Sequence, residues 1–188
     1  MSLRAEIVAT GREMLRLGLV SGTSGNVSGR AGERIEITPS GLPYEHMTET
    51  DLVTLAADGS VVAGHREPSS EHRVHLAVYA ARPDALAIVH THSVHATAWS
   101  LLGETLDTGT EELEHQAGGA VRTARFAPTG SDEIAELCVE ALDDRRAVLL
   151  GGHGVVALGT SPMAALVTCQ SVERQAQIAW LVRGSGRA

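Results

Sequence analysis

The sequence contains no lysine, because all fifteen of its cationic side chains are arginines. A Schiff base needs a lysine amine, and the phosphate-binding loop of P-loop nucleotide hydrolases also depends on a lysine. Lysine-dependent aldolase chemistry, pyridoxal-phosphate enzymes and P-loop hydrolysis are therefore excluded. Carbonyl chemistry in this chain would need a metal ion.

Cysteine is also scarce, and the two that occur, Cys138 and Cys169, are far apart in the sequence. They match neither a CxxC metal motif nor a disulfide framework. Each lies in an apolar pattern with helical spacing, so we expect both to pack in the core as small hydrophobic residues.

Clustered cations and long apolar runs are missing as well. The net charge is -8 and only Arg145 and Arg146 are adjacent, which argues against a nucleic-acid partner. No apolar run approaches the roughly 20 residues of a membrane span. The first residues lack the pattern of a signal peptide, so we expect a cytoplasmic protein that contacts no membrane.

The 188 residues, 43 % of them apolar, predict a single globular domain over residues 1–188. Strand-like and helix-like segments alternate, which indicates an α/β or α+β layered sheet. Residues 183–188 are expected to fray. The predicted helices cover residues 3–19, 72–82, 94–102, 131–144 and 161–182, and the predicted strands cover residues 34–38, 52–55, 61–62, 85–90, 147–150 and 155–158.

Two stretches show no such periodicity. Residues 21–28 are expected to form a loop of small residues, either a plain turn or a cradle for an anion. Between Gly103 and Pro128 the pattern is poor, and the acidic stretch 106–114 is expected to be a solvated loop or face. A second small-residue turn contains Ser40 and Gly41.

Histidines mark the most promising chemistry. His90 and His92 end an apolar run, and side chains two apart on a strand point to the same side. Imidazole is the commonest metal ligand, and catalytic zinc sites use three protein ligands with one open position. His153 lies in a glycine-walled turn between two apolar strands. Glu71, expected in the first turn of a helix, is the natural carboxylate for the same centre or for proton transfer, and His75 is a reserve ligand.

Two rival motifs fail on context. Residues 152–157 match G-x-G-x-x-A, but β-branched residues continue there as a strand where a dinucleotide fingerprint needs a helix. No G-x-S-x-G nucleophile motif occurs, so Ser69 and Ser70 are interpreted as helix-capping or anion-binding hydroxyls.

Taken together, these motifs resemble one family, the metal-dependent class II aldolases of the L-fuculose-1-phosphate aldolase and L-ribulose-5-phosphate 4-epimerase type, which includes adducin head domains. The matching pieces occur in the family's order and cover nearly the whole chain. They are Ser24-Gly25-Asn26-Val27-Ser28, Ile37-Thr38-Pro39-Ser40-Gly41, Pro68-Ser69-Ser70-Glu71, the run from Arg82-Pro83-Asp84 to Val89-His90-Thr91-His92, and Gly152-His153-Gly154.

The resemblance implies a site residue by residue. His90, His92 and His153 would bind Zn²⁺, or another divalent ion such as Mn²⁺ or Co²⁺, with Glu71 as fourth ligand and acid/base. The positions implied to hold the substrate phosphate are Asn26, Ser40, Gly41, Ser69 and Ser70.

The resemblance also implies an activity and an assembly. The metal would act as a Lewis acid on a small phosphorylated ketose and stabilise an enediolate while the carbon–carbon bond breaks, giving dihydroxyacetone phosphate and an aldehyde. The implied fold is a central, largely antiparallel sheet flanked by helices, assembled as a homotetramer with active sites at subunit interfaces.

Glu71 favours the aldolases over the epimerases, which have aspartate at this position. Where fuculose-phosphate aldolase places a tyrosine from the neighbouring subunit, this chain has Glu111 and Glu112. Glu112 is therefore a candidate acid, as in methylthioribulose-1-phosphate dehydratases, although those enzymes lack a counterpart of Glu71. The alternatives are a sugar-phosphate dehydratase or 4-epimerase and, from another class, an adducin-like assembly protein without catalysis.

Overall fold

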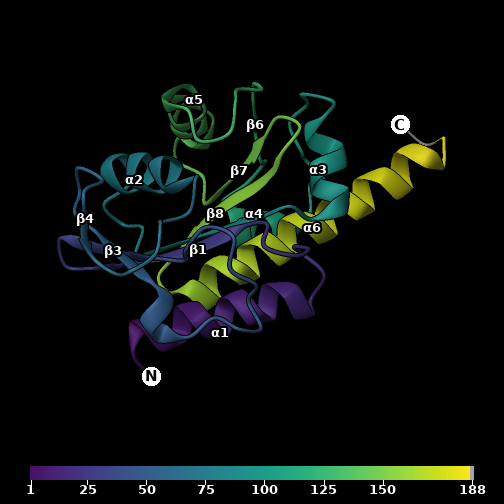
Figure 1. Ribbon diagram of the computed structural model, residues 1–188. Coiled ribbons are helices and arrows are strands. Elements are labelled where there is room, and N and C mark those ends of the chain that lie inside the picture. Colours follow the sequence, from purple (N-terminus) through teal and green to yellow (C-terminus); the bar gives the residue numbers. More distant parts are fainter. Residues whose placement is uncertain (187–188) are drawn as a thin grey trace.

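A computed structural model describes residues 1–186 and, within them, an eight-stranded sheet in the order β4-β3-β2-β1-β5-β8-β7-β6 (Figure 1). Every neighbouring pair is antiparallel except β6 and β7, which are parallel. The predicted α/β fold with a central, largely antiparallel sheet is confirmed. The strands are β1 (Asn26–Ala31), β2 (Arg34–Ile37), β3 (Val53–Leu55), β4 (Val61–Ala63), β5 (Ala87–Thr91), β6 (Thr123–Ala124), β7 (Ala147–Leu150) and β8 (Gly154–Gly159).

Helices cover both faces of this sheet. In Figure 1, α2 and α5 lie together on one side, whereas α1 and the long α6 lie on the other. The helices are α1 (Leu3–Arg16), α2 (His72–Ala81), α3 (Val94–Ser100), α4 (Glu111–Ala117), α5 (Asp132–Leu142) and α6 (Pro162–Gly184), with one 3-10 turn at Glu49–Asp51.

The central strand β5 explains why two cores form. All five of its residues are buried, and because side chains alternate across a strand, each face of β5 supplies a different core. Ile88 packs in the core under α2 and α5, while Val89 packs in the core under α1, α3 and α6. Cys138 and Cys169 are buried and free, one in each core, as predicted.

One local prediction is wrong. Residues 26–28 belong to β1 instead of a loop, because pairing with β2 and β5 on both sides outweighs the weak strand propensity of Asn, Ser and Gly. The acidic stretch contains the helix α4, which the pattern did not predict, but Glu111, Glu112 and Glu114 in its first turn are exposed, as expected for a solvated face. The side chain of Thr110 caps the N-terminus of this helix.

At the end of the chain, α6 continues through Gly184, beyond the predicted helix end at residue 182. Arg183 in this last turn pairs with Glu104 at 2.6 Å and stacks over the Trp99 ring. The fraying of residues 183–188 stays a prediction. The last two residues of the predicted tail, 187–188, lie outside the described residues. None of the helices in residues 1–186 combines the length and apolar character needed to cross a membrane.

Candidate metal centre

The four predicted metal ligands converge in the structure. Glu71, His90, His92 and His153 each offer one ligand atom, and these atoms all lie within 4.8 Å of one another. His90 Nε2 lies 2.9 Å from His92 Nε2 and 3.3 Å from a Glu71 oxygen. His153 Nε2 lies 3.0 Å from the other Glu71 oxygen.

Three separate segments deliver these side chains. His90 is the fourth residue of β5, and His92 follows that strand immediately, outside it. His153 lies in the tight turn between β7 and β8, as its glycine neighbours predict. Glu71 is the N-cap of α2 and not part of its first turn, and its side chain makes no capping hydrogen bond. The carboxylate is therefore free to face the histidines.

Close backbone contacts bring β8 and β1 against the histidine strand. A Cβ on Gly154 would lie 2.1 Å from the Thr91 carbonyl oxygen, and one on Gly25, whose φ is +73°, would lie 2.6 Å from the His90 carbonyl oxygen. Only glycine fits at either contact. Gly25 precedes Asn26 and Gly154 follows His153, so these close contacts hold the backbone beside two predicted site residues against the histidine strand.

The tautomer of His90 is set by the backbone. Its Nδ1 lies 2.8 Å from the Val155 carbonyl oxygen, which only accepts hydrogen bonds, so Nδ1 carries the proton and Nε2 presents a lone pair. A backbone carbonyl on the far nitrogen is the usual arrangement for a histidine that ligates metal.

Burial controls the protonation states. Burial lowers the pKa of His90. For His92, burial and the charges of the neighbouring His90 and His153 lower the pKa to about 3. Burial alone would raise the pKa of Glu71, but His90, the close contact with His153 and the amide of Asn26 outweigh it and hold that pKa well below its usual range. The neutral imidazoles of His90 and His92 and the ionised carboxylate of Glu71 are in the form that binds a divalent metal.

The buried polar atoms fit a bound cation. Glu71 Oε1 and His153 Nε2 are buried and lack a hydrogen-bond partner, although they lie 3.0 Å apart. Ligands of one tetrahedral zinc ion, with bonds of about 2.0 Å, lie roughly 3.3 Å from one another. The cluster is therefore able to bind a divalent metal through these four residues, whereas His75 lies outside it.

The predicted phosphate-binding residues form two groups. Pro39 and Pro68 form a β-bridge, Ser40 N donates to the Glu67 carbonyl oxygen, and Ser69 N donates to the Thr38 carbonyl oxygen. The turn with Ser40 and Gly41 thus lies beside the segment with Ser69 and Ser70, which precedes Glu71. Among these four residues only Ser69 is buried.

Asn26 is placed differently from the other predicted phosphate residues. It pairs with His90 across β1 and β5, and its side chain is 2 % exposed. Its Nδ2 donates to Glu71 Oε2 at 2.8 Å and its Oδ1 lies 2.5 Å from His75 Nε2. Both polar atoms of the amide are thus engaged with protein groups. This contact with Glu71 was not predicted, because β1 was interpreted as a loop.

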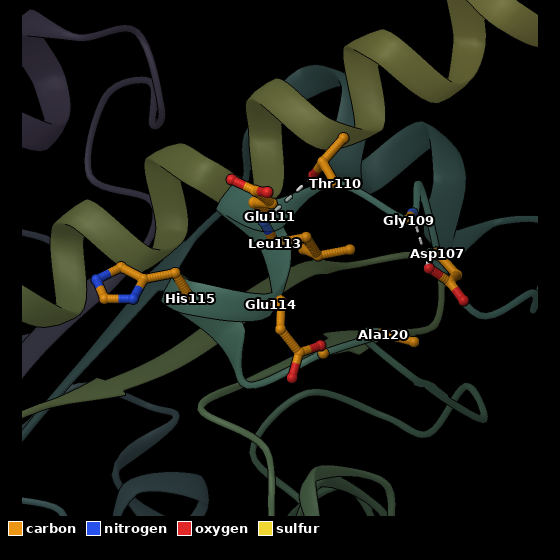
Figure 2. A pocket seen from close by; sticks show the side chains of 9 residues that line it. Asp107, Gly109, Thr110, Glu111, Leu113, Glu114, His115 and Ala120 are labelled. Carbon is orange, nitrogen blue, oxygen red and sulfur yellow. Dashed lines mark hydrogen bonds between the residues drawn. The ribbon is translucent and has the colours of Figure 1, made fainter.

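Glu112 lies apart from the metal cluster of its own chain. Gln175 on α6 donates to its carboxylate at 3.1 Å, and Arg174 lies 3.5 Å from the same oxygen. Glu111 belongs to the other side of α4, where it lines a surface pocket of about 440 Å³ with Asp107 and His115 (Figure 2). The two neighbouring carboxylates therefore serve different surfaces.

Comparisons with known proteins agree with this geometry. Residues 5–180 match the family model described as Class II Aldolase and Adducin N-terminal domain. The chain is 40 % identical to L-fuculose phosphate aldolase of Escherichia coli K12 over 94 % of this chain and 81 % of that protein. It is also 40 % identical to 5-deoxy-D-ribulose 1-phosphate aldolase of Bacillus thuringiensis, over 97 % of this chain and 86 % of that protein.

A solved structure named L-fuculose 1-phosphate aldolase superposes with a TM-score of 0.94 at 35 % identity, covering 98 % of this chain and 87 % of that one. The named relatives are aldolases, which are lyases that use a divalent metal in this class, and the described residues provide a cluster that suits one. The chain belongs to the class II aldolase and adducin family and is a class II aldolase.

Proposed function

We propose that this enzyme cleaves a small 1-phosphorylated ketose to dihydroxyacetone phosphate and an aldehyde. The observation that carries the proposal is the cluster of the buried Glu71 and His90 with the half-buried His92 and His153. It lies next to two loops with exposed backbone and hydroxyl groups. Two relatives are named as aldolases of L-fuculose phosphate and of 5-deoxy-D-ribulose 1-phosphate, and these names support this substrate class.

In this proposal the two adjoining loops hold the substrate phosphate. Ser40, Gly41 and Ser70 are exposed beside the buried Ser69. The hydroxyl groups of Ser40 and Ser70 and the backbone N–H groups of Gly41 and Ser70 can therefore donate to phosphate oxygens. Asn26 lies at the inner end of this site, where its amide donates to Glu71. A phosphate held there places the ketose next to the histidine cluster.

Glu71 is the proposed acid/base. A zinc ion, or Mn²⁺ or Co²⁺, held by Glu71 and the three histidines supplies Lewis-acid polarisation of the substrate carbonyl. Oε2 of Glu71 accepts a hydrogen bond from Asn26, while Oε1 has no partner. Cleavage releases a proton from the hydroxyl group that becomes the aldehyde oxygen and consumes a proton at the carbon that retains the electron pair. The carboxylate of Glu71, ionised at rest, takes up a proton and delivers it to this carbon.

The proposed assembly is a homotetramer in which Glu112 acts at the site of a neighbouring subunit. Glu112 does not reach the cluster of its own chain, in keeping with a role across an interface. Leu101 and Phe126 are 72 % and 73 % exposed and lie over Gly152, next to His153. A second subunit would bury this apolar rim of the site.

Substrate profiling tests the function. The zinc-loaded enzyme is incubated with the phosphates of fuculose, ribulose and methylthioribulose, and dihydroxyacetone phosphate is measured with a coupled dehydrogenase. We expect it to form from at least one ketose 1-phosphate. Loss of water from a sugar phosphate without release of dihydroxyacetone phosphate indicates a dehydratase. Formation of an epimer from ribulose 5-phosphate indicates an epimerase. Protein that binds no metal and converts none of these sugars would support the adducin-like alternative.

The mass in solution tests the assembly. We expect light scattering to give four chains for the parent and a smaller mass for Phe126→Ser. Leu86→Ser, at another exposed apolar side chain, is the control that keeps the parent mass. A monomeric parent contradicts the interface.

A further inference from the structure

A chain of buried hydrogen bonds leads from Glu71 into the core beneath α2. Asn26 contacts the carboxylate at 2.8 Å and His75 Nε2 at 2.5 Å. On the other side of the imidazole, Nδ1 lies 2.6 Å from Ser28 Oγ, which in turn lies 2.8 Å from the Tyr79 hydroxyl. None of the five residues linked by these hydrogen bonds is more than 5 % exposed. The row of hydrogen bonds is thus shielded from water along its whole length.

The chemistry of the groups fixes the direction of every hydrogen bond. An ionised carboxylate only accepts, so Asn26 must present its NH₂ group to Glu71 and its oxygen to His75. His75 must then carry its proton on Nε2, which leaves Nδ1 as an acceptor. Ser28 donates to Nδ1 and accepts from Tyr79. The ring of His75 is neutral, because burial lowers its pKa to about 3.

We propose that His75 is a positioning residue for the acid/base Glu71, acting by locking the side-chain amide of Asn26 with its NH₂ group toward the carboxylate. This inference rests on the proposed role of Glu71. It explains why Oε2 is anchored while Oε1 has no hydrogen-bond partner.

The orientation of the Asn26 side-chain amide is the feature that depends on His75. An Asn side chain can rotate by half a turn and exchange its oxygen and nitrogen with little change in shape. The rotated amide would point its oxygen at the carboxylate and repel it. Without the Nε2–H of His75, the oxygen of Asn26 has no donor and the correct orientation loses its support.

The tautomer of His75 tests the lock without any substrate. Nitrogen-15 spectra of the zinc-loaded protein, labelled at histidine and assigned by difference with His75→Gln, report which ring nitrogen carries the proton. We expect Nε2–H for His75 and the opposite tautomer, Nδ1–H, for His90, whose Nδ1 faces the Val155 carbonyl. A proton on Nδ1 of His75 overturns the proposal.

Proton exchange tests the consequence for Glu71. Dihydroxyacetone phosphate alone is incubated with zinc-loaded enzyme in D₂O, so that only the proton transfer is observed. We expect His75→Leu to lower kcat for exchange at least tenfold with KM changed less than twofold. His75→Gln, which keeps both a donor and an acceptor, should recover most of the rate.

A matched control separates positioning from general weakening of α2. Val78 is fully buried on the same helix and its apolar side chain cannot take part in these hydrogen bonds, so Val78→Ala should lower the melting temperature and leave kcat for exchange near the parent value. Equal losses in Val78→Ala and His75→Leu, or no rescue by His75→Gln, overturn the proposal. If the parent exchanges no proton, the proposed function fails, and the tautomer still decides whether the lock exists.

Discussion

Glu71 Oε1 and His153 Nε2 lie 3.0 Å apart, both buried and both without a hydrogen-bond partner. An unpaired carboxylate oxygen and an unpaired imidazole nitrogen are costly in a protein interior. A cation bound between them removes this cost. The contact therefore links the architecture, which brings α2 to the turn between β7 and β8, with the chemistry expected of the family.

Gly154→Ala is expected to disrupt the site through the backbone. The added methyl group would overlap the Thr91 carbonyl oxygen at 2.1 Å, so β5 and β8 must separate at the histidine cluster. We expect the free energy of unfolding to fall by roughly 3 kcal/mol, measured by urea denaturation. Gly184→Ala, at the exposed end of α6 with open space around it, is the control and should be neutral or stabilising by up to about 1 kcal/mol. Similar losses in both variants would contradict the close-contact account.

Glu173 is expected to fix the start of α3, directly after His92. Its carboxylate on α6 accepts from the backbone N–H groups of His95 and Ala96 at 3.0 and 2.9 Å, and it contacts His95 Nδ1 at 2.7 Å. Removing these charge-assisted bonds in Glu173→Ala should cost about 2 kcal/mol of stability and weaken zinc binding in a competition titration. The control Glu136→Ala, at an exposed site on α5, should change neither stability nor zinc affinity. An unaltered zinc affinity in Glu173→Ala would show that α3 does not position His92.

Stability is expected to fall below about pH 6.5, partly through His75. The unfolded chain binds a proton on this residue near pH 6.5, whereas burial lowers the pKa to about 3 in the folded protein. Between these values the unfolded state holds more protons, so the free energy of unfolding decreases with falling pH by up to about 1.4 kcal/mol per unit.

His75→Gln isolates that contribution, since Glu71, His90 and His72, the ionisable groups that act on His75, remain in both proteins. Its stability should depend less steeply on pH between 6.5 and 4, as measured by urea denaturation. Val78→Ala, which adds or removes no proton, should lower stability without altering the slope. Parallel curves for the parent and His75→Gln would show that His75 is not buried in its neutral form.

Much of this site follows from local pattern. His90 and His92 end a buried run, and His153 occupies a turn whose glycines permit its placement, so strand periodicity and turn chemistry suffice to predict a cluster. That His92 lies just beyond the strand does not alter the result, because its Nε2 still lies 2.9 Å from His90 Nε2. The start of the predicted helix before the strand indicated Glu71, and the resemblance to a family gave this residue the role of fourth ligand.

What the sequence did not predict depends on pairing between distant segments. Asn26 and Ser28 lie in a strand of low intrinsic propensity, which forms because β2 and β5 pair with it. Only this pairing puts Asn26 beside Glu71 and makes His75 a hydrogen-bonding partner instead of a reserve ligand. Similarly, α4 is a short acidic helix stabilised by the Thr110 cap and by packing of Leu113 in the core, and neither is visible as helical periodicity.

Glu112→Gln tests the role of the carboxylate that stands in place of a tyrosine. We expect slower cleavage with unchanged zinc content, because this residue lies outside the metal cluster. Glu111→Gln, on the other side of α4 in the pocket of Figure 2, is the matched control and should retain the parent rate. Identical kinetics for Glu112→Gln and the parent would remove Glu112 from the mechanism.

Metal content measures the central claim most directly. Purified parent, His92→Ala, and the exposed-site control His46→Ala are stripped with a chelator, reloaded with zinc, freed of excess ion and analysed by mass spectrometry of the metal. We expect one zinc per chain in the parent and the control, and less than about a tenth of that in His92→Ala, because each lost ligand or supporting group costs roughly ten- to a hundredfold or more in affinity. Full zinc occupancy in His92→Ala, or none in the parent, would contradict a metal centre built from Glu71, His90, His92 and His153.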